Sequence, residues 1–98
     1  MNSLTNKQRR YLRSKAHHLQ SIFQVGKQGV TDELAKQLCL ALEARELIKM
    51  NVLNNAEVDA KEAAELLEEK TGAEVVQTIG NVIVLYKMSE KNPTIQLP

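Results

Sequence analysis

Residues 21–34 read SIFQVGKQGVTDEL, and this stretch decides the fold. At its start, Phe23 and Val25 share one face while Gln24 takes the other, an alternation that predicts a short strand over 21–25. The GKQG segment then interrupts the pattern. Thr31 follows as a helix N-cap, because its hydroxyl can accept from a free amide and the two acids after it suit the positive end of a helix dipole. The stretch therefore predicts a strand, a tight glycine loop and a helix in direct succession.

The chain downstream continues to alternate between helical and strand periods. Apolar residues recur at helical spacing from Leu34 to Leu42, and strict alternation replaces them at Ile48. The dipeptide Gly80-Asn81 between two apolar runs is a strong hairpin signal. The elements predicted after the loop are a helix to about Leu47, a strand over 48–52, a helix from its cap Asp59 to its stop Gly72, and a hairpin of strands 75–79 and 82–86.

Upstream of the loop, residues 4–19 predict an amphipathic helix with Thr5 as its N-cap. The full order is then helix, strand, helix, strand, helix, strand, strand. Strands that alternate with helices imply neighbouring parallel strands, while the final hairpin adds an antiparallel pair. The sequence therefore predicts an α/β fold of two layers (α+β), with a four-stranded mixed sheet covered by helices. We expect a single domain over 1–87 and a loosely attached tail over 88–98.

The charge is distributed unevenly along the 98 residues. The net charge is only +1, yet residues 1–31 carry six lysines and arginines and no acid, whereas residues 32–98 carry seven bases and twelve acids. A surface of one sign attracts its opposite over about 8–10 Å in ordinary salt. The basic N-terminal third favours a polyanionic partner, and the alternative is a solvated basic helix that only keeps the protein soluble.

Several classes of function find no support in the residues. The single cysteine, Cys39, excludes an internal disulfide and a CxxC metal site, and the pair His17-His18 lacks further ligands, so we expect no metal and no cofactor. The apolar runs are too short for a membrane span, and no signal peptide follows the basic start. No P-loop or GxGxxG motif is present, so we expect neither an enzyme nor a small-molecule substrate. We expect a cytoplasmic protein.

The glycine loop is the first candidate site, formed by Gly26, Lys27, Gln28 and Gly29. Two glycines let the chain adopt positive φ and let another backbone approach closely. Lys27 and the free amides at the start of the following helix favour a phosphate group. A plain tight turn is the alternative interpretation. The aromatic residues are too few for a platform that stacks single-stranded bases, so we expect contacts to phosphate and sugar of structured RNA.

Four segments of the chain resemble the CRM domain, whose name stands for chloroplast RNA splicing and ribosome maturation, and within it the stand-alone bacterial YhbY-type proteins. They are LTNKQR at 4–9, VGKQGVT at 25–31, ARELIK at 44–49 and GNVIVLY at 80–86. The resemblance implies RNA binding in the cytoplasm and association with precursors of the large ribosomal subunit. It also implies a fold similar to the C-terminal domain of translation initiation factor 3, with an added N-terminal helix.

The resemblance places the family's GxxG loop on residues 26–29 and its basic surface on Lys7, Arg9, Arg10, Arg13 and Lys15. The leading hypothesis is a non-enzymatic, monomeric RNA-binding protein that assists assembly of the large ribosomal subunit. The alternative is a protein-interaction module that docks a ribosomal protein or translation factor through the acidic outer face of the 59–72 helix.

Overall fold

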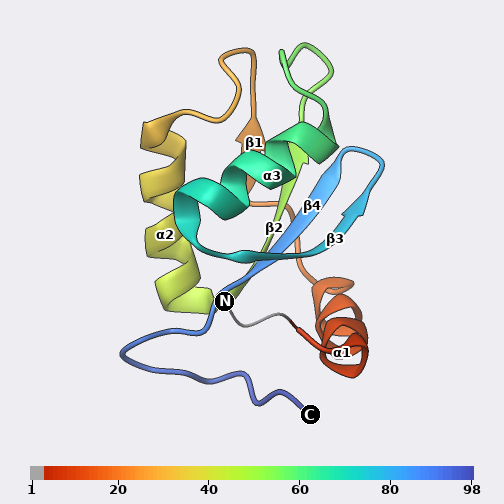
Figure 1. Ribbon diagram of the computed structural model, residues 1–98, viewed down its shortest axis with the longest axis vertical. Coiled ribbons are helices and arrows are strands. Elements are labelled where there is room, and N and C mark those ends of the chain that lie inside the picture. Colours follow the sequence, from red (N-terminus) through yellow and green to blue (C-terminus); the bar gives the residue numbers. More distant parts are fainter. Residues whose placement is uncertain (1–3) are drawn as a thin grey trace.

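The computed structural model describes residues 4–98 and has the predicted order of elements (Figure 1). The four-stranded mixed sheet and its covering helices are confirmed. The elements are α1 (Asn6–Ala16), β1 (Phe23–Val25), α2 (Asp32–Arg45), β2 (Leu47–Val52), α3 (Ala60–Thr71), β3 (Glu74–Ile79) and β4 (Val82–Tyr86).

The strands lie in the order β1-β2-β4-β3. β1 pairs with β2 in parallel, with Phe23 opposite Met50, whereas β4 pairs antiparallel with both β2 and β3. Only one pair of neighbours is therefore parallel, because β4 lies between β2 and β3. Its sequence, VIVLY, explains the central position: four of its five residues are buried, which requires cover on both faces.

The predicted helix caps are confirmed. The Thr5 hydroxyl accepts from the Gln8 amide at 3.1 Å and the Gln8 side chain accepts in return from the Thr5 amide, which completes a capping box. Thr31 and Asp59 accept from the amides three residues ahead. Gly72 ends α3 in the left-handed conformation.

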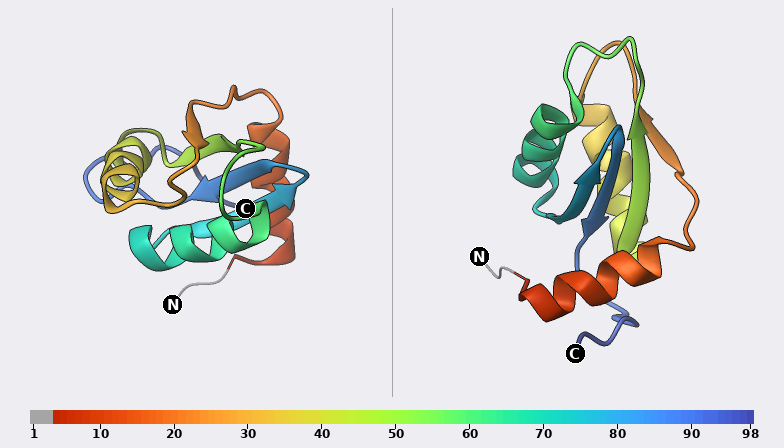
Figure 2. Two further views of the ribbon diagram at one scale, coloured as in Figure 1. Left: turned by 90° about the horizontal axis from the view of Figure 1, so that it is seen from above. Right: turned by 90° about the vertical axis from the view of Figure 1, so that its right-hand side faces the viewer.

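The helices cover both faces of the sheet (Figure 2). α2 and α3 pack on one face over the main core, whose buried members include Leu38, Leu42, Met50, Leu67 and Ile83. α1 crosses the opposite face at one end of the sheet, over a second, smaller core. That core is made of Leu12, Ala16, Leu47, Val76, Val84 and Tyr86.

The first helix and strand are shorter than predicted. α1 ends at Ala16, where the amides of His18 and Leu19 donate to carbonyls only three residues back. β1 begins at Phe23 because residues 17–22 carry the chain from the α1 face to the edge of the sheet.

The tail is not loosely attached, in contrast to the prediction. Ser89 is buried, and the amides of Ser89, Thr94 and Ile95 donate to the Glu46 carboxylate at 2.7–2.8 Å. Glu43 accepts from the Ser89 hydroxyl and from the amides of the next two residues. Ile95 and Leu97 then pack against the second core. Glu43 and Glu46 at the end of α2 thus hold the tail in place. The prediction missed this because residues 88–98 show no helical or strand periodicity.

Glu46 ends α2 in an unusual way. It has φ +66° and is 1% exposed, although most buried left-handed positions belong to glycine. Burial opposes its charge, but the hydrogen bonds from Ser89, Ile95 and Thr94 outweigh that effect and lower the pKa of Glu46 below its ordinary value. The hydrogen bonds to the tail therefore compensate both the strained backbone and the buried carboxylate.

Candidate nucleic-acid interface

The GxxG loop follows β1 directly as a closed turn. The Gly29 amide donates to the Gly26 carbonyl at 2.9 Å, and Lys27 and Gln28 are exposed at the tip. Gly29 has φ +74°, so the turn itself favours glycine there. Gly26 has an ordinary φ, and a Cβ on it would meet only Leu53 among the described residues, at 4.0 Å. Nothing in residues 4–98 requires glycine at position 26.

Acidic residues lie in the segments next to the loop. Asp32 and Glu33 occupy the first turn of α2, and the adjoining 53–59 segment brings Glu57 and Asp59. A hydrogen bond from Lys70 at 2.6 Å lowers the pKa of Asp32, so this carboxylate stays ionised at the helix start. The positive end of α2 is thus already compensated, and attraction for a phosphate rests on Lys27 and the loop amides.

α1 carries the exposed basic surface. Lys7, Arg10, Arg13 and Lys15 are exposed, and the first three make no side-chain hydrogen bond or ion pair with any residue of 4–98. The Lys15 ammonium lies 5.5 Å from the centre of the Tyr11 ring. We call these four side chains the α1 basic surface.

Arg9 differs from the other predicted bases because it is engaged with β3. A β-bulge at Val76 interrupts the pairing of β3 with β4, and the Arg9 guanidinium donates to the carbonyls of Val75 and Val76. It also forms an ion pair with Glu74 at 3.0 Å. Arg9 therefore fastens α1 to the sheet through both terminal nitrogens of its guanidinium.

The loop and the α1 basic surface lie at opposite ends of a molecule that measures 37 × 26 × 25 Å (Figures 1 and 2). The structure does not bring the two groups of predicted residues together. Polar residues of β1 and β2 lie between them on the face that α1 leaves partly open: Gln24, Lys49 and Asn51, with Asn51 accepting from the Ser21 hydroxyl at 2.9 Å.

Two bases that the prediction omitted lie beside the C-terminal end of α1. Arg45 and Lys49 line one groove together with Lys15, and the Lys49 ammonium donates to the Leu19 carbonyl at 3.4 Å. No local pattern could have revealed this, since the three residues come from three elements that only the folded chain brings together.

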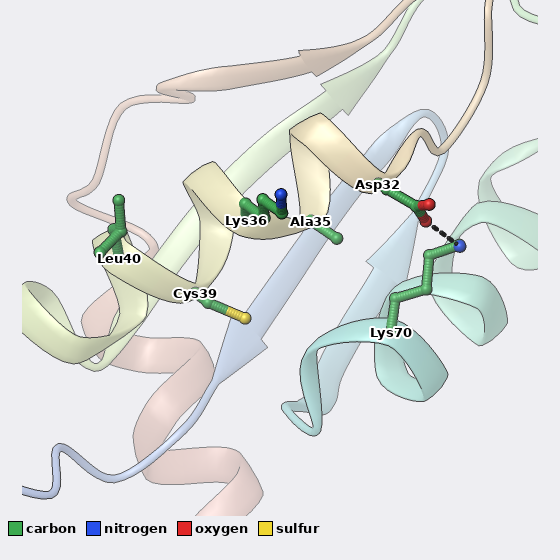
Figure 3. Close-up of a pocket in the computed structure, with 6 residues that line it drawn as sticks. All are labelled: Asp32, Ala35, Lys36, Cys39, Leu40 and Lys70. Carbon is green, nitrogen blue, oxygen red and sulfur yellow. Dashed lines mark hydrogen bonds and ion pairs between the residues drawn. The ribbon is translucent and has the colours of Figure 1, made fainter.

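A second groove lies between α2 and α3 (Figure 3). It has a volume of about 630 Å³ and mixed charge, with the Asp32–Lys70 ion pair on one side and Leu40, 74% exposed, on the other. Cys39 is half-buried at this groove, with its Sγ 3.9 Å from the Thr71 carbonyl oxygen. Within residues 4–98 no group of three histidine, cysteine or acidic side chains could hold a metal ion, and no helix is long and apolar enough to cross a membrane.

The sequence model of the CRS1/YhbY (CRM) domain matches residues 4–87. The chain belongs to the CRM family. It is 60% identical to the Bacillus subtilis protein named Probable RNA-binding protein YqeI, over 97% of this chain and 99% of that protein. A Haemophilus influenzae protein named RNA-binding protein is 36% identical over 100% and 98% of the two chains. The solution structure of a Staphylococcus aureus protein has the same fold, with a TM-score of 0.81, 52% identity, and coverage of 98% of this chain and 100% of that one.

The CRM match ends at residue 87, before the tail. The Bacillus subtilis relative nevertheless matches 97% of this chain, so the similarity continues into residues 88–98. In this CRM protein the tail is part of the folded unit through Glu43 and Glu46.

Proposed function

We propose that this CRM protein binds structured RNA through the α1 basic surface and the GxxG loop, as a non-enzymatic, monomeric, cytoplasmic factor in the assembly of the large ribosomal subunit. The observation that carries the proposal is the α1 basic surface, where four exposed cations stand on one helix that contains no acid. The names of the relatives as RNA-binding proteins support it.

The α1 end and the loop end of the molecule contribute differently to the proposed RNA binding. α1 supplies most of the electrostatic attraction, because phosphate contacts release counterions and α1 carries four exposed bases, whereas Asp32 and Glu33 follow the loop at the other end. The loop supplies a place where a sugar–phosphate backbone can approach closely, since Gly26 keeps its surface free of a side chain. The polar residues of β1 and β2 offer hydrogen-bonding groups along the path between the ends.

Ultraviolet crosslinking in growing cells tests the proposed target. We expect reads concentrated at one site of large-subunit rRNA, with crosslinked peptides from α1 or from residues 26–29. Reads scattered in proportion to RNA abundance would contradict a specific role in ribosome assembly and leave only non-specific attraction by α1.

A second candidate function is protein docking on the acidic side, favoured by the groove between α2 and α3 with its exposed Leu40. Glu62, Glu65 and Glu69 of α3 are exposed, whereas Glu68 accepts from the Val75 amide and supports the fold. To test protein docking, the charge of the α3 face should therefore be reversed with Glu62→Lys and Glu65→Lys, and Glu68 should be left intact. Loss of ribosome association with unchanged binding to naked RNA would favour protein docking over the leading proposal.

A further inference from the structure

The groove at the C-terminal end of α1 combines positive charge with apolar surface. It has a volume of about 610 Å³, within the range of pockets that hold small ligands. Residues from α1, the 17–22 connection, the end of α2, β2 and the tail line it. The lining residues are Lys15, His18, Leu19, Gln20, Ile22, Arg45, Leu47, Ile48, Lys49 and Ile95.

The charged groups of this groove are all of one sign. Lys15, Arg45 and Lys49 line it, and no aspartate or glutamate does. Glu46 follows Arg45 in the chain, but its carboxylate is buried against the tail amides and is occupied by four hydrogen bonds. Three cations around one groove suit a phosphate, which arginine can bind with two parallel hydrogen bonds.

The same groove exposes apolar and flat side chains. Ile22 is 41% and Leu19 37% exposed, and His18 lines the groove with them. Unstacked RNA bases stack on flat side chains, and histidine is one of these. A phosphate site next to an apolar surface matches the two chemical parts of a nucleotide.

We infer that this groove holds one unpaired nucleotide of a structured RNA, its phosphate against Arg45 and Lys49 and its base against Ile22, Leu19 and His18. The inference rests on the proposed RNA binding and deepens it. It assigns the RNA class as a helix with a bulged or looped-out nucleotide rather than a continuous duplex. α1 then follows the flanking phosphates with Arg10 and Arg13.

The test compares three RNA hairpins by fluorescence titration: a perfect duplex stem, the same stem with one bulged nucleotide, and the same stem with an abasic bulge. We expect the intact bulge to bind about tenfold more tightly than the other two, because the base gains stacking contacts. The abasic stem keeps the flexibility and the phosphate of the bulge, so it isolates the base.

Ile22→Ala should remove the preference for the intact bulge and leave duplex binding unchanged. Leu40→Ala, which truncates an exposed aliphatic side chain at the other groove, is the matched control and should keep the preference. Arg45→Gln should weaken binding to both bulged stems, whereas Lys36→Gln, an exposed cation on the same helix, should not. Circular dichroism confirms that each variant is folded.

Two results would overturn the inference alone: equal binding of all three RNAs, or a preference for the intact bulge that Ile22→Ala does not reduce together with affinities for the bulged stems that Arg45→Gln does not reduce. Failure of every RNA to bind the wild-type protein would instead overturn the proposed RNA binding, and the groove assignment with it.

Discussion

At the scale of single residues, two arginines one helical turn apart have different roles. Arg9 donates to the carbonyls of Val75 and Val76 at the β3 bulge, whereas Arg13 is exposed and makes no side-chain hydrogen bond or ion pair within residues 4–98. Arg9→Ala should lower the free energy of unfolding by about 1–3 kcal/mol, the cost of unsatisfied buried polar groups. Arg13→Ala should change stability by less than about 0.5 kcal/mol and reduce the salt slope of RNA binding by about one unit.

Urea unfolding and salt-dependent RNA titrations of both variants check this pair. A stable Arg9→Ala protein with a reduced salt slope would show that Arg9 belongs to the RNA surface after all.

The sequence placed both arginines on one basic helix, and helix phase alone could not separate their roles. The separation depends on the bulge at Val76, which has no signal in the sequence.

Glu46 is the second residue whose role only the folded chain reveals. Its carboxylate accepts four hydrogen bonds from the tail, so Glu46→Ala should destabilise the fold and release residues 89–95. We expect faster hydrogen exchange at the amides of Ser89, Thr94 and Ile95 and a loss of about 2–4 kcal/mol of stability. Unchanged exchange at these three amides would contradict the anchoring role.

The same carboxylate makes stability depend on pH. Its pKa is lowered in the folded state because hydrogen bonds from the tail outweigh burial, which alone would raise it. Its stabilising contribution is therefore complete above the unfolded value of 4.5 and is lost as the pH falls through the lower folded value. Glu46→Gln should flatten the decline of stability between about pH 5 and 3. Some decline should remain, since a hydrogen bond from Ser89 also lowers the pKa of Glu43.

At the scale of elements, the GxxG loop allows a test in which charge is the only variable. Gly29 has φ +74° and open space where a Cβ would lie, and asparagine and aspartate tolerate the left-handed region better than other residues. Gly29→Asn and Gly29→Asp should therefore fold with similar stability. Gly29→Asp should bind RNA about fivefold more weakly than Gly29→Asn, the effect of about 1 kcal/mol for one added charge near a phosphate.

Equal affinities of the two Gly29 variants would exclude the loop from the RNA contact.

The elements themselves were largely predictable, because caps such as Thr31 and Asp59 and the turn at Gly80 act through neighbouring residues. The folded arrangement of the tail was not predictable, because it depends on Glu43 and Glu46, more than 40 residues away in the chain. Local patterns predict local hydrogen bonds and miss such distant partners.

At the scale of the whole molecule, the arrangement of the candidate sites follows from strand order. The parallel pairing of β1 with β2 sends the GxxG loop to one end of the sheet, while the second core holds α1 at the other. The same pairing brings Lys49 to the end of α1, where Arg45 joins it. The sequence identified the basic and glycine-rich segments but not their separation, because strand order in a mixed sheet depends on long-range pairing.

This separation determines how changes at the two ends combine. Sites far apart that share no partners contribute independently, so the losses of binding free energy from Arg13→Ala and Gly29→Asp should add to within about 0.5 kcal/mol on one RNA that reaches both ends. The measurement is a double-mutant cycle in RNA affinity at fixed salt. A double mutant that binds clearly more weakly than the sum predicts would mean that RNA can use either end alone, because each single variant would then still bind through its intact end. Additivity would instead require one RNA to contact both ends at once, along the polar face of β1 and β2.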